Sequence, residues 1–334
     1  MTPMTSAAAP RRRRAALATS AALVGSLALA ACGSGSDSAA GSGADKGAAD
    51  GGTHVVKTVM GDVKVPNEPK RVVVLDTAEL DSAITLGVKP VGATHAGVAD
   101  GFLSYLPEDR IQGIEKVGNI AAPSLEKIAA LKPDLILSSK VRDADRYDEL
   151  SKIAPTVFAE GVGYPWKENF LLHAEALGKQ EEAKKVVTEY EKHAAEVTEA
   201  LGGEEKAAQT TVSATRFVEG GDIRLYGRKN YIGTVLEDAG LGRPAVVDKA
   251  EDGFAYEVSP EQIDKADADV VFYTSFGDSS KSGESKTLDG SLWKNMKAVK
   301  AGRAFHVNDD LWFMGIGYTA ADQILDELEA KLAK

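Results

Sequence analysis

The sequence predicts an α/β protein with two lobes, each holding a central, mainly parallel β-sheet flanked by helices, and a long α-helical spine that joins them. Three observations support this fold. Strand-like and helix-like segments alternate over residues 55–165, only helix patterns follow over residues 166–203, and the alternation resumes over residues 204–334. Such alternation is typical of parallel sheets, because helices connect their strands.

The first lobe begins with a strand that we expect to be buried on both faces. Residues 71–76, RVVVLD, form a nearly continuous apolar, β-branched run, as in the interior strands of parallel sheets. The helix pattern after it ends at Gly87, since glycine commonly terminates a helix. The other expected elements are a strand at residues 90–94, a helix and a strand within residues 124–138, a helix at residues 145–153 and a strand at residues 156–158.

The spine contains one glycine before residue 202, Gly178, followed by a long amphipathic segment. Residues 181–201 place their apolar side chains in one stripe, which is typical of a single helix lying on a surface. The length and central position of this helix also suit a rigid connection between lobes. In the second lobe we expect strands at residues 210–218, 269–276 and 304–307, and helices at residues 230–240 and 318–332.

The amino terminus has the pattern of an export signal. Residues 1–31 contain four arginines, no Asp, Glu or Lys, and a mostly alanine run that is thin for a membrane span of about 20 strongly apolar residues. The paired arginines also allow twin-arginine export. Cys32 follows in the stretch LAAC and is the only cysteine, so no intramolecular disulfide can form. An incidental or buried cysteine is the plainer interpretation of this residue.

Residues 32–54 are expected to form a flexible tether, because most of them are small or polar and bury too little apolar surface to fold. The folded body then begins near Val55. Removal of residues 1–31 takes away four of the 39 basic residues and leaves 35 against 50 acidic ones. A chain this acidic, without a basic patch interleaved with aromatic residues, is not expected to bind nucleic acid.

One short stretch occurs twice. Residues 124–136, SLEKIAALKPDLI, resemble residues 259–271, SPEQIDKADADVV. Four identical pairs are each separated by 135 positions: Ser124 and Ser259, Glu126 and Glu261, Ile128 and Ile263, and Asp134 and Asp269. Each lobe therefore carries one copy, with a glutamate at the same place. The plainer interpretation of these glutamates is stabilisation of a helix start, where a negative charge contributes about 0.3–1 kcal/mol.

Together these features resemble the iron–siderophore substrate-binding lipoproteins of ABC importers. The resemblance rests on LAAC and the tether, KRVVVLD, LGVKPVG, SLEKIAALKPDLIL, the long central helix, SPEQI and GRAFHVNDDLW, and it covers nearly all of residues 71–332. It implies a monomer that binds an Fe(III)–siderophore complex without an intrinsic cofactor. It also implies that Cys32 is lipidated and anchors the protein to the outer face of the cytoplasmic membrane, which the chain contacts through the lipid alone.

The resemblance also gives the doubled glutamates a function. In this family each lobe carries a surface glutamate that pairs with arginines on one half of the dimeric permease, and Glu126 and Glu261 match those positions. Two like docking points on two like lobes suit a two-fold symmetric partner. Charge pairing of this kind favours register and encounter rate more than affinity.

Ligand class is predicted from charge. Catecholate complexes are strongly anionic and call for several cleft arginines, whereas hydroxamate complexes are neutral or slightly positive. Catecholate-binding relatives place three arginines around the ligand. Arg142 matches one of these positions, and Tyr231 and Phe276 match the other two. We therefore expect a ferrioxamine-like trishydroxamate, whose methylene linkers would lie against aromatic faces.

Eight residues are candidates for the cleft. The main set is Arg142, Tyr231, Phe254, Phe276 and Trp312, with Arg216 as a second donor and Trp166 and Tyr105 as weaker candidates. Core packing is the alternative for the two phenylalanines, and helix packing is the favoured one for Trp166. Arg142 has the alternative of pairing with a neighbouring aspartate.

Other functions receive less support from the sequence. No G-x-S-x-G, P-loop or H-E-x-x-H motif occurs, and no two histidines stand at metal-ligand spacing. An enzyme is therefore not expected, and iron would be held by the siderophore alone. The alternatives within binding proteins are haem, cobalamin and a catecholate siderophore. Haem would need a tyrosine or histidine ligand in the cleft.

Overall fold

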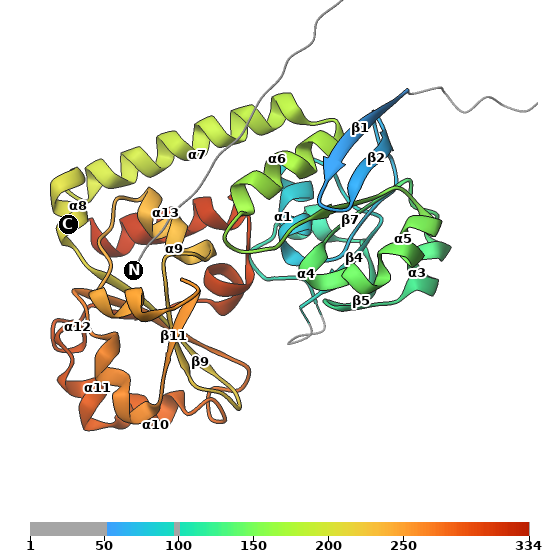
Figure 1. Ribbon diagram of the computed structural model, residues 1–334. Helices are drawn as coiled ribbons and strands as arrows, with labels where there is room; N and C mark the ends of the chain where they lie inside the picture. Colours follow the sequence, from blue (N-terminus) through green and yellow to red (C-terminus); the bar gives the residue numbers. More distant parts are fainter. Residues whose placement is uncertain (1–51, 97–100, 334) are drawn as a thin grey trace, which may run out of the picture. The chain divides into compact units, whose positions relative to one another are not determined.

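The computed structural model describes residues 52–96 and 101–333 (Figure 1). The predicted signal peptide, the lipidation site Cys32 and nearly all of the predicted tether lie outside these residues. The described chain begins with a hairpin of β1 (Thr53–Thr58) and β2 (Gly61–Pro66). His54, which we expected in the tether, lies in β1, and its Nε2 donates to the Glu175 carbonyl at 2.9 Å.

The first lobe is built on a six-stranded sheet with the order β6-β5-β4-β3-β7-β8. All neighbouring pairs are parallel except β5 and β6. The central strand β3 and its neighbour β7 are wholly buried, as predicted from their continuous apolar runs. The strands are β3 (Val72–Val74), β4 (Gly92–His95), β5 (Glu115–Asn119), β6 (Ala122–Pro123), β7 (Leu135–Ser139) and β8 (Thr156–Ala159).

Helices connect these strands. The side chain of Asp76 accepts a hydrogen bond from the Thr77 amide and caps α1, which is buried along nearly its whole length. The helix ends at Thr85, two residues before Gly87, which adopts a positive φ of 76°. The helices of this lobe are α1 (Thr77–Thr85), α2 (Glu108–Ile111), α3 (Leu125–Ala130), α4 (Lys140–Asp143), the 3₁₀ turn η1 (Ala144–Arg146) and α5 (Tyr147–Ile153).

The second lobe has a five-stranded sheet with the order β11-β10-β9-β12-β13. Strands β9, β12 and β13 are parallel, whereas β10 and β11 run antiparallel to their neighbours. The parallel arrangement predicted for this lobe thus covers three strands of five, because the short β9–β10 connection allows only an antiparallel hairpin. The strands are β9 (Val212–Val218), β10 (Ile223–Tyr226), β11 (Ala255–Val258), β12 (Val270–Phe276) and β13 (Ala304–His306).

Short helices flank the second sheet, and the longest helix of this lobe is α13 (Tyr318–Leu332). None of the helices in the described residues is long and apolar enough to cross a membrane. The helical elements are α9 (Tyr231–Asp238), η2 (Ala245–Lys249), η3 (Pro260–Ala266), α10 (Glu284–Asp289), α11 (Ser291–Asn295), α12 (Lys297–Lys300), the π-helical turn η4 (Asp310–Met314) and α13 (Tyr318–Leu332). Together the two flanked sheets confirm the predicted α/β class.

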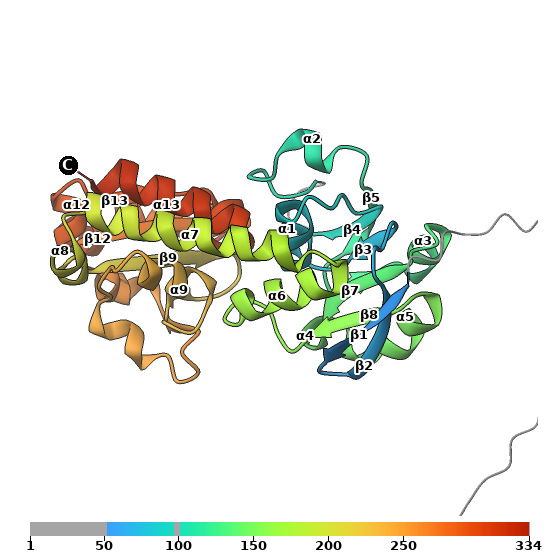
Figure 2. The same cartoon turned by 90° about the horizontal axis from the view of Figure 1, so that it is seen from above.

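The predicted helix-only stretch consists of α6 (Trp166–Leu177), α7 (Gln180–Ala200) and α8 (Glu204–Gln209). Gly178 separates α6 from α7 in the left-handed conformation, with φ 67°. A Cβ atom at this position would lie 2.2 Å from the Asn67 carbonyl oxygen, so only glycine fits. Helix α6 packs on α1, and α7 runs alongside α13 (Figure 2). One buried apolar cluster extends through elements of both lobes.

The doubled stretch has the same internal roles in both lobes. Ile128 on α3 and Ile263 on η3 are buried in the core. Asp134 accepts hydrogen bonds from the Lys70 and Arg71 amides at 2.8 and 2.9 Å, just before β3. Asp269 likewise accepts from the amide and hydroxyl of Thr211 at 2.9 and 2.7 Å, just before β9. Each aspartate therefore holds the start of a parallel neighbour strand.

We predict that Asp269→Asn lowers the free energy of unfolding by about 1–2 kcal/mol at pH 7, since it removes charge-assisted hydrogen bonds. Hydrogen bonds from Lys297 and Thr211 lower the pKa of Asp269 from 3.8 to about 2. The stabilisation is therefore present above about pH 4 and is lost as the pH falls toward 2. Urea unfolding at pH 7 and pH 3 measures both effects.

The matched control is Asp264→Asn, which changes an exposed aspartate in η3. This variant should unfold like the wild type at both pH values. A deficit in Asp269→Asn that stays constant from pH 7 to pH 3 would contradict the proposed role of the ionised carboxylate.

Candidate ligand-binding site

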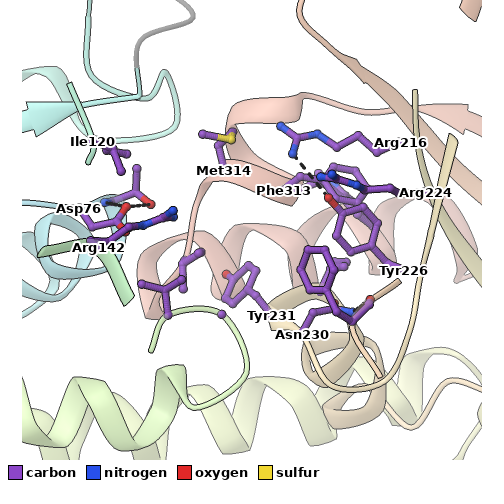
Figure 3. Close-up of a pocket in the computed structure, with 17 residues that line it drawn as sticks. Asp76, Ile120, Arg142, Arg216, Arg224, Tyr226, Asn230, Tyr231, Phe313 and Met314 are labelled. Carbon is purple, nitrogen blue, oxygen red and sulfur yellow. Dashed lines mark hydrogen bonds and ion pairs between the residues drawn. The ribbon is translucent and has the colours of Figure 1, made fainter. Parts of the chain in front are cut away.

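A cavity of about 350 Å³ lies between side chains of the two lobes (Figure 3). Figure 3 shows Asp76 and Arg142 on one side of it and Arg216, Arg224 and Tyr226 on the other. The polar lining residues are Asp76, Thr77, Arg142, Arg216, Arg224, Tyr226, Asn230 and Tyr231, and the others are Ile120, Val162, Gly163, Ile232, Phe254, Trp312, Phe313, Met314 and Ile316.

Arg142 lines the cavity from α4, as the sequence predicted. Its Nε donates to Asp76 Oδ2 at 2.6 Å, so its ion-pair partner is not one of the sequence neighbours we had considered. Asp76 is buried and uses its other carboxylate oxygen to accept the Thr77 amide at 2.7 Å. The cap of α1 thus fixes the carboxylate that holds Arg142, and no hydrogen bond from another described residue occupies the Nη atoms of Arg142.

A second buried carboxyl group lies near this pair without adding a charge. Burial, followed by the neighbouring Asp76 charge, raises the pKa of Glu79 to about 8, so this group is protonated at pH 7. Burial also lowers the pKa of His173 to about 3 and keeps its ring neutral, with Nε2 3.7 Å from Glu79 Oε1. One carboxylate, from Asp76, therefore balances Arg142.

Arg216 lines the opposite side of the cavity from β9. Its guanidinium binds Asp309 with two prongs, Nε to Oδ1 at 2.7 Å and Nη2 to Oδ2 at 2.5 Å. Burial opposes its charge, but hydrogen bonds to Asp309 and Tyr226 more than compensate and raise the pKa of Arg216. The Arg216 side chain is nearly buried. Two of its three guanidinium nitrogen atoms are already bonded to Asp309.

A third arginine, Arg224 on β10, also lines the cavity and was missed by the sequence analysis. Its Nε donates to Glu257 Oε1 at 3.2 Å. Arg224 and Tyr226 are two residues apart on one strand, so both face the same side of the sheet. The alternation of side chains along this strand is the sequence pattern from which Arg224 and Tyr226 could have been predicted to face the cavity together. Each of the three cavity arginines is therefore paired with one protein carboxylate.

Asn230 and Tyr231 lie where the loop after β10 enters α9. The Asn230 side chain caps the helix by accepting the Gly233 amide at 2.8 Å, and it donates to the Phe254 carbonyl at 2.7 Å. Tyr231, which the sequence predicted as a lining residue, donates its hydroxyl to the Gly317 carbonyl at 3.0 Å. The tyrosine ring is thus presented to the cavity while its polar end is occupied.

The predicted aromatic residues divide into two groups. Phe254 lines the cavity, and its ring meets Tyr226 edge-on at 5.5 Å. Phe276 is not among the lining residues, because it lies against the Arg216 guanidinium at 4.5 Å. Arg216 thus lines the cavity where we had expected an aromatic face at Phe276.

Trp312 is wholly buried although it stands among the lining residues. Its indole packs against Phe272 at 4.3 Å and donates to Glu327 Oε2 at 3.0 Å. The next two residues, Phe313 and Met314, are only partly buried and line the cavity beside it. These residues form the π-helical turn η4, which directs neighbouring side chains to different sides.

Trp166 and Tyr105 do not line the cavity. Trp166 is buried, donates to Thr234 Oγ1 at 2.8 Å and packs in an aromatic cluster, which is the helix-packing role that we had favoured. Tyr105 donates its hydroxyl to the buried Asp81 at 2.9 Å. Asp81 in turn accepts the Thr319 amide at 3.1 Å, so Tyr105 belongs to a contact between α1 and α13.

The described residues contain no group of three or more His, Cys, Asp or Glu side chains placed to hold a metal ion. None of the described histidines is among the cavity-lining residues. The donors that the cavity offers are arginine, asparagine and tyrosine groups, which suit the oxygen atoms of a ligand.

Comparison with known proteins gives consistent matches. The family model of the periplasmic binding proteins matches residues 72–311. The chain is 38% identical to the probable siderophore-binding lipoprotein YfiY of Bacillus subtilis (strain 168), over 84% of this chain and 88% of YfiY. It is 30% identical to the iron(3+)-hydroxamate-binding protein FhuD of that strain, over 91% of each chain. Staphylococcus aureus SirA complexed with staphyloferrin B has a similar structure, with a TM-score of 0.75, 32% identity, and coverage of 84% of this chain and 98% of SirA.

We predict that Trp312→Phe lowers the free energy of unfolding by about 2–3 kcal/mol, because it leaves a cavity and removes the hydrogen bond to Glu327. Phe313→Leu should cost less than about 1.5 kcal/mol, since the side chain is only partly buried. Urea unfolding of the two variants beside the wild type tests the difference. Equal losses would mean that Trp312 is not the core residue of this turn.

Proposed function

The chain belongs to the periplasmic binding protein family, and on that premise we propose that its cavity captures a ferric hydroxamate siderophore, with ferrioxamines as the first candidates. Its siderophore-binding relatives make it a substrate-binding protein of an ABC importer and not an enzyme. This membership confirms the family resemblance of the sequence. The iron is part of the cargo, held by the siderophore.

The balance of charge in the cavity carries the hydroxamate proposal. Arg142, Arg216 and Arg224 contribute three positive charges, and their partners Asp76, Asp309 and Glu257 contribute three negative ones. A trianionic catecholate complex would enter a site without a net opposing charge and would lose its hydration there. A hydroxamate complex is neutral or slightly positive and does not need an excess of arginines.

Apolar walls support the same ligand class. Ile120, Ile232, Phe254, Phe313 and Met314 line the cavity beside the arginines. Methylene linkers buried against them would contribute about 25 cal/mol for each Å² removed from water. The Nη atoms of Arg142 and Arg224, which their carboxylates do not engage, would donate to hydroxamate oxygens.

A carboxylate siderophore is the second candidate. Three arginines line one cavity, which is one more than the two that the sequence predicted, and an arginine can exchange a protein carboxylate for one on a ligand. The structure of SirA contains staphyloferrin B, and SirA is 32% identical to this chain. The two candidates differ in the charge of the ligand, so one titration series separates them.

We predict that the purified protein binds ferrioxamine more tightly than ferric staphyloferrin B or ferric enterobactin in isothermal titration calorimetry. Tightest binding of staphyloferrin B would support the second candidate. Tightest binding of the catecholate enterobactin would contradict the argument from charge balance. A Soret band on the purified protein would instead identify haem as its ligand.

In the same assay, Arg224→Met should raise the Kd for ferrioxamine between about tenfold and a hundredfold, because it removes a charged hydrogen-bond donor. The matched control is Arg228→Met, which removes a surface arginine paired with Asp248 outside the cavity lining. The control should bind like the wild type. Equal Kd values for both variants would place the ligand elsewhere.

We also propose that Glu126 and Glu261 dock the permease. Both are exposed, whereas the isoleucine and aspartate of each copy are used inside the fold. Hydrogen bonds from its own backbone amide and from Ser259 lower the pKa of Glu261, which is therefore ionised at neutral pH. Two exposed carboxylates, one in each lobe, suit the two halves of a dimeric permease. Lipidation of Cys32 would hold the protein at the outer face of the membrane.

We predict that the double variant Glu126→Ala with Glu261→Ala abolishes siderophore-dependent uptake by cells and leaves the Kd of the purified protein unchanged. Reversal of both residues to Lys should abolish uptake as well, because like charges would face the permease arginines. Normal uptake by the double Lys variant would mean that the glutamates have no docking role. Loss of binding as well as uptake would place them at the ligand site.

A further inference from the structure

Arg243 is a buried arginine outside the cavity lining, and within the part of the chain that the structure describes its guanidinium binds only main-chain carbonyls. It lies between Gly242 and Pro244 in the segment after α9, and 7% of it is exposed. Its Nη2 donates to the Tyr226 carbonyl at 2.6 Å, its Nη1 to the Gly227 carbonyl at 3.2 Å and its Nε to the Val212 carbonyl at 2.9 Å.

No carboxylate of the described residues forms an ion pair with this guanidinium. Burial lowers the pKa of Arg243 to about 10, so the group stays charged at neutral pH despite its surroundings. A buried charge without an ionic partner is costly unless hydrogen bonds satisfy it. Here the three carbonyls satisfy the charge by accepting hydrogen bonds. The planar guanidinium points its donors at all three carbonyls, whereas the compact ammonium group of a lysine could not reach all three.

Two of these carbonyls belong to the loop that forms the wall of the cavity. The Tyr226 ring lies in the cavity, 4.8 Å from the ring of Phe313, and its hydroxyl accepts from Arg216 at 3.5 Å. The Gly227 carbonyl is shared, since it also accepts from Asn230 Nδ2 at 3.1 Å. A shift of the carbonyls that Arg243 holds would therefore move both lining side chains.

The loop has little room to absorb such a shift. A Cβ atom on Gly227 would lie 2.2 Å from the Gly253 carbonyl oxygen, and one on Gly233 would lie 2.5 Å from the Gly227 carbonyl oxygen. The Gly227 amide also donates to the Phe254 carbonyl at 2.7 Å. The main chain of this wall is therefore closely packed on both sides.

We propose that Arg243 is a positioning residue for the ligand site: its guanidinium fixes the wall that presents Tyr226 and Asn230, and it sets the affinity and selectivity of the cavity without touching the ligand. This inference rests on the proposed function of the cavity. It assigns to Arg243 a role that differs from those of Arg142, Arg216 and Arg224, whose side chains line the site.

The test compares Arg243→Met and Arg243→Lys with a matched arginine in the other lobe. Arg71 also donates only to carbonyls, those of Leu131 and Lys132, but it is exposed and is not a lining residue. Calorimetric titrations use ferrioxamine and ferrichrome, two trishydroxamate complexes of different shape, at a temperature where circular dichroism shows each variant to be folded.

Arg243→Met should raise the Kd for ferrioxamine about tenfold, through loss of the hydrogen bonds that hold the wall. Arg243→Lys should raise the Kd less than Arg243→Met does, because it keeps the positive charge but loses the planar guanidinium that binds three carbonyls. Both should change the ratio of the two Kd values. Arg71→Lys should lower Tm and leave both Kd values unchanged. A purely structural role for Arg243 would lower Tm without changing the ratio.

Unchanged Kd values in Arg243→Lys and Arg243→Met, with weakened binding in Arg224→Met, would overturn this inference and leave the proposed function intact. Unchanged binding in all three variants would overturn the cavity assignment and this inference with it. If Arg243→Met fails to fold, Arg243→Lys decides the matter, and an unchanged Kd ratio in that variant overturns the inference.

Discussion

The cavity depends on the pairing of each of its three arginines with a carboxylate of the protein. Asp76 divides its two oxygens between the cap of α1 and Arg142. Asp309 stands at the entrance of η4 and binds Arg216 with both oxygens. Because a main-chain amide holds the carboxylate that binds Arg142, and because Asp309 binds Arg216 with two hydrogen bonds, these two guanidiniums are oriented before a ligand arrives, which reduces the entropy cost of binding. The same pairs leave the site without excess charge.

Local signals explain which parts of the fold could be predicted from the sequence. The apolar run of β3 and β7 indicated buried strands, and Gly87 and Gly178 marked helix ends because both adopt left-handed backbone conformations. The antiparallel hairpin of β10 could not be recognised from strand pattern alone. The direction of a strand depends on the length and path of the segment that connects it to its neighbour, and that path cannot be read from the sequence.

The site was predicted less completely, because lining depends on which way neighbouring side chains point. Arg142, Arg216, Tyr231, Phe254 and Trp312 are among the lining residues, although Trp312 is wholly buried, whereas Phe276 lies against Arg216 and does not line the cavity. Aromatic identity alone does not distinguish a core residue from a wall residue. That distinction depends on contacts distant in sequence, such as the hydrogen bond between Trp312 and Glu327 or the packing of Phe272.

The carboxylate of Asp81 joins two distant parts of the polypeptide, and this has a consequence for the order of folding. It accepts the Thr319 amide, 238 positions further along the chain, and thereby caps the first turn of α13. A Cβ atom on Gly317 would lie 2.1 Å from the same carboxylate, so the approach tolerates no side chain. Contacts this far apart in sequence close slowly compared with local ones. We therefore expect α13 to pack against α1 late in folding, after the elements held by local contacts have formed.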